Sequence, residues 1–138
     1  MYEHGQGVAQ SGVEAVQWYI KAADQDFAQA QSNLGNMYQQ GQGVPQSDVE
    51  AVRWFRKSAD RGNANAQSNL GFMYEQGQGV AQSDVEAVRW YQKSADQGLA
   101  EAQFNLGIMY AQGQGVAQNY VEAVQWFKKA ANQGHALA

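Results

Sequence analysis

The stretch AQAQSNLGNMYQQGQGVPQSDVEAVRWFRKSADRG, residues 28–62, carries two stripes of apolar and small side chains. At 100° per residue, each stripe has the i, i+3, i+4, i+7, i+8 spacing of an amphipathic helix. The first stripe consists of Ala30, Asn33, Leu34, Met37 and Tyr38, and the second of Ala51, Trp54, Phe55, Ser58 and Ala59. The stretch therefore predicts a pair of helices, here called A and B. Neither helix can bury its stripe alone.

The same pattern recurs along the whole chain. Gly-Gln-Gly-Val begins at Gly5, Gly41, Gly77 and Gly113, so the period is 36 residues without insertion or deletion. The run Val-Glu-Ala-Val, a tryptophan and a lysine recur at matching positions; the tryptophans are Trp18, Trp54, Trp90 and Trp126. A fixed period of this size is typical of stacked repeats, in which each B helix packs on its own A helix and on the next one.

Helix starts and stops are also visible in the sequence. Gly41 follows helix A, where a left-handed residue ends helices. Ser47 to Glu50 has the form of a capping box, in which the serine accepts from the Glu50 amide and the Glu50 side chain reaches back. Gly62 closes helix B. These signals repeat in each copy, with Ser11 and Asn119 in the place of Ser47, and they predict helices near 11–24, 28–40, 47–60, 64–76, 83–96, 100–112 and 119–132.

Glycine also recurs in the middle of helix A, at Gly35, Gly71 and Gly107. Such a glycine costs about 1 kcal/mol relative to alanine. A cost repeated at one position predicts a close approach by a neighbouring helix, with Trp and Tyr side chains beside it.

Residues 28–62 resemble a Sel1-like repeat, a relative of the tetratricopeptide repeat with the pattern A-x-A-x-x-x-L-G-x-x-Y-x-x-G-x-G-V-x-x-D-x-x-x-A-x-x-W-x-x-x-A-A-x-x-G. The resemblance covers essentially all 138 residues. It implies an all-α fold, a right-handed α-solenoid of antiparallel helix pairs. It also implies one array over residues 1–138, with a partial repeat at 1–27, repeats at 28–63, 64–99 and 100–135, and the start of a further helix at 136–138. Gly12 and Tyr120 replace the expected acid, and Asp26 replaces the closing glycine.

Composition limits the classes of partner. The formal charge is −4, which disfavours nucleic acid. No apolar run approaches the ~20 residues that cross a bilayer, so we expect no direct membrane insertion. The chain has no cysteine, which excludes disulfides and thiolate metal sites but does not fix the compartment. The repeat pattern begins and stops within a helix A, which predicts a piece of a longer array.

No pattern indicates catalysis, a metal or a cofactor. The two histidines, His4 and His135, stand alone at opposite ends. The Gly-x-Gly of each loop follows a helix and lacks the third glycine and the lysine of a phosphate-binding loop. Glutamates recur as cap partners, and near-identical copies do not supply the distinct environments that paired catalytic carboxylates need. We therefore expect no enzyme.

Function is expected where the copies differ. By resemblance to tetratricopeptide arrays, the helix A face opposite the stripe lines a concave groove. Its positions are polar in the second repeat and become apolar and acidic in the third and fourth. The predicted partner-binding residues are Gln29, Ser32, Asn36, Gln39, Asn65, Ser68, Phe72, Glu75, Gln76, Glu101, Phe104, Ile108 and Gln112.

Several functions remain open at this stage. The first is a scaffold that holds a neutral or basic peptide, or a protein surface, with Phe72, Phe104 and Ile108 as an apolar anchor. These side chains could equally pack on each other or on another segment of a longer chain. A second function is a structural array that self-associates head to tail through its uncapped ends. A third is an accessory segment of an enzyme whose chemistry lies elsewhere.

Overall fold

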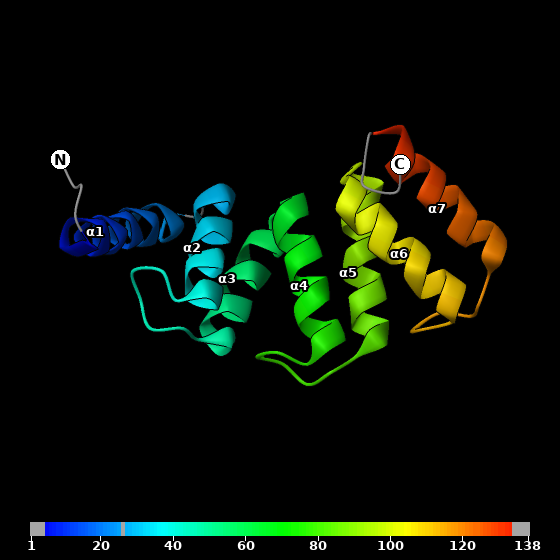
Figure 1. The fold of residues 1–138 in the computed structure, drawn as a ribbon, viewed down its shortest axis with the longest axis horizontal. Helices are drawn as coiled ribbons and strands as arrows, with labels where there is room; N and C mark the ends of the chain where they lie inside the picture. The colour runs from blue at the N-terminus through cyan, green and yellow to red at the C-terminus, as the bar shows by residue number, and fades with distance from the viewer. Residues whose placement is uncertain (1–4, 26, 134–138) are drawn as a thin grey trace. The chain divides into compact units, whose positions relative to one another are not determined.

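The computed structural model describes residues 5–25 and 27–133, and within them the chain forms helices and no strand (Figure 1). The described helices are seven, as predicted: α1 (Gly5–Ala23), α2 (Ala28–Gln40), α3 (Asp48–Asp60), α4 (Ala64–Gln76), α5 (Asp84–Asp96), α6 (Ala100–Gln112) and α7 (Tyr120–Asn132). The all-α prediction is confirmed. The A helices α2, α4 and α6 have the predicted bounds, and α3, α5 and α7 begin one residue later than predicted because the first expected residue is the cap.

The chain divides into two compact units. The first is Met1–Asn63, in which α2 packs on α1 and on α3. The second is Ala64–Ala138, in which α5 packs on α4 and α6, and α6 packs on α7. In the second unit, the B helix α5 therefore contacts its own A helix and the next one, as the stripes predict, and in the first unit the A helix α2 contacts the B helices on both sides of it in the sequence. A single continuous array over residues 1–138 stays a prediction.

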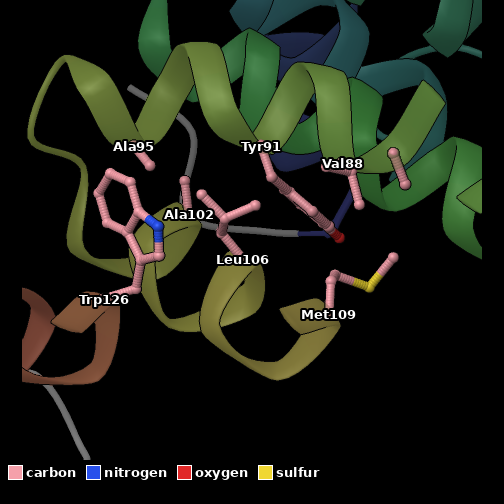
Figure 2. Close-up of a cluster of buried hydrophobic side chains, with 8 residues drawn as sticks. Val88, Tyr91, Ala95, Ala102, Leu106, Met109 and Trp126 are labelled. Carbon is pink, nitrogen blue, oxygen red and sulfur yellow. The ribbon is translucent and has the colours of Figure 1, made fainter. Parts of the chain in front are cut away.

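The core of the second unit lies between α5, α6 and α7. Figure 2 shows Tyr91 and Val88 of α5 facing Leu106 and Met109 of α6, with Trp126 of α7 closing one end. In the first unit, Trp54 belongs to the matching cluster with side chains of α1 and α2. The stripe that carries the tryptophan is therefore the buried face of α3, α5 and α7, as the sequence indicates, whereas Trp18 of α1 is exposed.

The mid-helix glycines admit an aromatic ring from the paired B helix. A Cβ on Gly35 would lie 2.6 Å from the Phe55 ring, and a Cβ on Gly107 would lie 2.7 Å from the Phe127 ring. Tyr91 takes this place against Gly71. The predicted close approach is confirmed, but the prediction of Trp beside the glycine is wrong. The ring comes from the residue after each tryptophan, because that residue points at the middle of helix A.

The two glycines of the Gly-Gln-Gly-Val loop after α6 have different roles. Gly113 adopts φ 67° and ends α6, and the Gln114 amide then donates to the Met109 carbonyl at 3.0 Å. Gly115 has φ 74°, and a Cβ there would collide with the Asp84 carbonyl oxygen at the start of α5. The loop thus needs glycine once to stop a helix and once to pass close to the previous B helix.

The first copy of this loop is not a loop. Residues 5–10 were expected to precede a helix capped by Ser11, but α1 is helical from Gly5. In later copies the loop is tied to the last turn of an A helix, for example by the Ser47 amide donating to the Tyr38 carbonyl at 2.9 Å. The described residues include no A helix before α1, and residues 5–10 belong to the helix instead. Asp26, His4 and His135, which are named in the sequence analysis, lie outside the described residues.

Only one half of the predicted capping box forms. Ser47 Oγ accepts from the Glu50 amide at 3.2 Å, and Asn119 Oδ1 accepts from the Glu122 amide at 3.0 Å. Glu50 does not reach back. Its carboxylate accepts from Arg53 at 3.2 Å, since the Ser47 amide already donates to Tyr38.

A glutamine ladder crosses the buried side of the A helices. Gln31 Nε2 and Gln103 Nε2 donate to the carbonyls of Ala23 and Ala95, each at 3.2 Å. Gln103 Oε1 in turn accepts from Gln133 Nε2 at 2.8 Å, whereas Gln31 Oε1 is buried and accepts no hydrogen bond from the described residues. The chain has Arg61 in the place that corresponds to Gln133.

The burial of the tryptophan stripe predicts a large difference between two chemically identical substitutions. Trp54 is 6% exposed and Trp18 is 70% exposed. We expect Trp54→Ala to lower the free energy of unfolding by about 3–5 kcal/mol, because it leaves a cavity in the core. Trp18→Ala is the matched control and should cost less than about 1 kcal/mol. Chemical denaturation monitored by circular dichroism measures both, and equal losses would contradict the assignment of the stripe.

The buried Gln31 Oε1, which accepts no hydrogen bond from the described residues, predicts a stabilising substitution. Arg61→Gln should supply a donor to Gln31 Oε1 and raise the free energy of unfolding by about 1 kcal/mol. The reciprocal change, Gln97→Arg, removes the 2.8 Å bond to Gln67 Oε1 and should lower it. Thermal unfolding of both variants tests the ladder, which would be discarded if neither variant moved the midpoint.

Candidate functional site

A pocket of about 410 Å³ lies between α4 and α6 of the second unit. Clefts that bind small-molecule ligands have volumes of about 300–1,000 Å³. Its lining consists of Ser68, Asn69 and Phe72 from α4 and Glu101, Phe104 and Asn105 from α6. Four of these six residues belong to the predicted partner-binding set. The structure therefore brings the variable positions of two consecutive A helices together around one opening.

The two aromatic side chains of the pocket are held differently. Phe72 is 40% exposed. Phe104 is half-buried, and its ring centroid lies 5.7 Å from that of Phe127 on α7, with the rings inclined at 49°. Tilted pairs at this separation are favourable for aromatic rings. Phe104 is thus held in place by Phe127, and part of its ring is buried within the unit. The Phe72 ring is accessible to solvent.

The polar side of the pocket carries an acid at its rim. Glu101 is exposed, and its Oε1 accepts from the hydroxyl of Ser68 at 3.4 Å. Ser68 is buried. Expecting Ser68 and its counterpart Ser32 on an exposed face was wrong, since both are almost fully covered. Ser68 instead lines the pocket and connects α4 to α6 through its hydrogen bond to Glu101.

A second acid of the same face is held by a buried phenol. The Tyr91 hydroxyl donates to Glu75 Oε1 at 2.8 Å. Burial is the main reason that the pKa of Tyr91 lies far above its usual range, followed by the hydrogen bond to Glu75 and by the charges of Glu75 and Glu101. The phenol therefore stays a neutral donor at physiological pH, and both carboxylates act on it with negative charge.

Basic side chains lie elsewhere. All nine lysines and arginines fall in α1, α3, α5 and α7 or directly after α3, and the sequences of α2, α4 and α6 have none. Several cover the tryptophan rings: Lys57, Lys93 and Lys129 lie 4.6, 4.6 and 4.4 Å from the ring centroids of Trp54, Trp90 and Trp126. The acids on α4 and α6 are therefore not neutralised by bases on the same helices.

The remaining predicted residues do not line this pocket. Ile108 is half-buried, Asn65, Gln76 and Gln112 are exposed, and Glu75 is half-buried beside Tyr91. In the first unit, Gln29 donates to Asn33 Oδ1 at 3.1 Å, and Asn36 and Gln39 are half-buried. Whether these residues take part in partner binding stays a prediction.

Two pocket residues were missed by sequence reasoning. Asn69 and Asn105 stand one and two repeats after Asn33, which the sequence pattern places in the buried stripe. Both are half-buried. An asparagine that recurs in a stripe of apolar and small residues was the available signal, since a polar side chain there needs a polar surrounding.

Two further properties bear on function. None of the described helices is both long and apolar enough to span a bilayer. Over the same described residues, no three or more His, Cys, Asp or Glu side chains are grouped in a way that could hold a metal ion.

Comparison with known proteins agrees with this architecture. The family model of the Sel1 repeat matches residues 1–27, 28–63, 64–99 and 100–135. Comparison with the curated proteins finds no match.

Solved structures give the same fold. The chain is similar to c5321, described as a protective antigen of uropathogenic Escherichia coli strains with an SLR fold, at 43% identity and a TM-score of 0.90 over 99% of this chain and 29% of that one. It is also similar to a Sel1 repeat protein from Oxalobacter formigenes, at 40% identity and 0.83 over 88% of this chain and 50% of that one. Cysteine rich protein B of Helicobacter pylori shares the fold alone, at 24% identity and 0.73, covering 94% and 92%. The chain thus spans half or less of the length of the first two neighbours.

Proposed function

The chain belongs to the Sel1 repeat family, and from this premise we propose that it is a non-catalytic module that binds an extended peptide or a protein surface along its A helices. Sel1-like repeat proteins are generally protein-interaction scaffolds. The observation that carries the proposal for this chain is the pocket between α4 and α6, whose lining includes three residues in which the repeats differ, Phe72, Glu101 and Phe104.

The division between constant and variable positions supports binding. Residues that recur in every copy, such as Leu106 and Trp126, lie in the packed core. Phe72, Phe104 and Glu101 interrupt the recurrence, and they meet at a surface opening. An exposed aromatic ring beside a second, anchored ring is the kind of surface on which interface hot spots form.

Charge favours a neutral or basic partner. The face carries Glu75 and Glu101 without a lysine or arginine on the same helices, and the whole chain has a formal charge of −4. An acidic polypeptide or a nucleic acid would be repelled by this surface.

The environment of Tyr91 supports the proposal that the module is non-catalytic. Tyr91 has a strongly raised pKa, but it is fully buried and its hydroxyl is bonded to Glu75, so it cannot reach a substrate. Perturbed groups mark active sites when they face a cleft. This one stabilises the packing of α5 on α4.

Removing the apolar anchor tests the interaction function. A partner is first captured by cross-linking to the chain and then purified, and its affinity is measured by calorimetry. The triple variant Phe72→Ala, Phe104→Ala, Ile108→Ala should weaken binding at least about tenfold, which corresponds to 1.4 kcal/mol. The matched control replaces the exposed valines Val49, Val85 and Val121 of the B helices by alanine and should leave the affinity unchanged. Unchanged affinity of a folded triple variant would remove the pocket from the binding site.

A second candidate function is self-association through the outer faces of α1 and α7. Trp18 is 70% exposed, although the matching tryptophans are buried. Val124 of α7 is 48% exposed, whereas Val88 at the same repeat position of α5 is 8% exposed and packs against α6. Exposed apolar surface at both faces is a feature of subunits that stack, and a contact between unlike faces that does not close gives open chains.

Light scattering distinguishes this candidate. If the faces associate, the mass of the wild-type chain should rise with concentration, and Trp18→Ser or Val124→Asp should abolish the rise. Val85→Asp places the same charge on an exposed valine of α5, which is neither of the two helices, and serves as the control. A monomer over the whole concentration range would eliminate self-association.

A further inference from the structure

We propose that the pocket between α4 and α6 is an arginine-binding subsite, which takes the side chain of an arginine in an extended segment of a partner protein. The inference rests on the proposed interaction function and adds the chemistry of the partner. It follows from three features of the pocket: its walls, its rim and the field around it.

The walls suit a flat cation with an apolar stem. Phe72 and Phe104 stand on consecutive A helices and both line the pocket. A guanidinium group stacks on phenyl rings more readily than an ammonium group, because it is planar and more weakly hydrated. Phe127 fixes the Phe104 ring from behind, so this wall exists before a ligand arrives and little freedom is lost on binding.

The rim supplies acceptors for the donors of the cation. A carboxylate offers about four lone-pair sites. The bond from Ser68 to Glu101 Oε1, at 3.4 Å, occupies one of them and is longer than a strong hydrogen bond. Glu101 can therefore accept the paired N–H groups of a guanidinium. Asn69 and Asn105 add polar side chains to the same lining.

The surrounding charges favour a cation over a neutral side chain. Glu75 lies on the same face, and the Tyr91 phenol holds its carboxylate there by a 2.8 Å hydrogen bond. Arg89 and Lys93 of the intervening helix α5 lie over the Trp90 ring at 5.6 and 4.6 Å, on the side of α5 that carries the tryptophan. An apolar ligand side chain would leave the acceptors of the rim without donors, and an acidic one would meet like charge.

The sequence places two phenylalanines and a glutamate together at one pair of consecutive A helices, α4 and α6. At the positions of Glu101 and Phe104, the previous A helix has Asn65 and Ser68. The second repeat has Gln29 and Ser32 at these positions and Asn36 at the position of Phe72. The aromatic walls and the acid therefore coincide between α4 and α6, and a partner is expected to place one arginine there.

Short peptides test the subsite directly. The probes are nonapeptides of alternating glycine and serine with one central residue: arginine, lysine, citrulline or norleucine. Binding is followed on the full chain by the shifts of backbone amides in ¹H–¹⁵N NMR spectra. The arginine peptide should shift amides of α4 and α6, and the neutral isostere citrulline should bind about tenfold more weakly, a difference of 1.4 kcal/mol. Lysine should bind more weakly than arginine, and added salt should weaken the arginine peptide most.

Two variants assign the effect to the named residues. Glu101→Gln should weaken the arginine peptide at least about fivefold and leave the norleucine peptide unchanged. Phe72→Ala should weaken both peptides, and the exposure of Phe72 makes this variant compatible with folding. The control is Asp96→Asn, which removes one charge from the second unit but keeps an acceptor for Gln92. It should leave the affinity for the arginine peptide within about twofold.

The outcomes separate this inference from the proposed function. Equal binding of arginine and norleucine peptides, or an unaltered response in Glu101→Gln, would overturn the arginine subsite. The interaction function would survive either result if the alanine triple variant still lost its captured partner. Loss of neither the partner nor the peptide in that variant would overturn both.

Discussion

The structure depends on an aromatic ring of each paired B helix lying against a glycine in the middle of its A helix. The ring and the glycine are 20 residues apart in each copy, as in Gly107 and Phe127. Glycine has a lower helix propensity than alanine. Because it has no side chain, the two helices approach closely at this point and bury the stripes of both. The tryptophan one position earlier is buried in the core clusters, so two adjacent aromatic residues of a B helix contribute to the packing.

This constraint separates stability from recognition. Core positions must repeat, because each B helix meets nearly the same surface on the A helices beside it. Positions on the opposite face of the A helices do not take part in the packing of that stripe. Variation there changes the surface without changing the stack, which explains how Phe72, Glu101 and Phe104 are tolerated. Tyr91 shows the limit of this separation, since its ring packs on Gly71 while its hydroxyl reaches Glu75 on the variable face.

Sequence periodicity was sufficient for the helix pairs because the physical signals were local. The bounds of α2, α4 and α6 follow from a stripe and a terminal glycine, and the caps of α3 and α5 follow from one serine each. The expectation failed where a local signal depended on a distant element. Residues 5–10 read as a loop because their copies are loops, but that loop is held by the last turn of an A helix. The second glycine of the loop had no explanation until Gly115 was seen against the Asp84 carbonyl.

The amino-acid sequence by itself determined the fold class, the buried stripes and the face on which the repeats differ, since each of these depends on spacing along one helix. Only the tertiary structure decided which variable residues meet. It placed α4 beside α6, so that Phe72 and Phe104, 32 residues apart, line one pocket. It also buried Ser68 and drew Asn69 and Asn105 into the lining. These outcomes depend on the distance and rotation between helices, which are set by the packing of side chains and not by the period of the sequence.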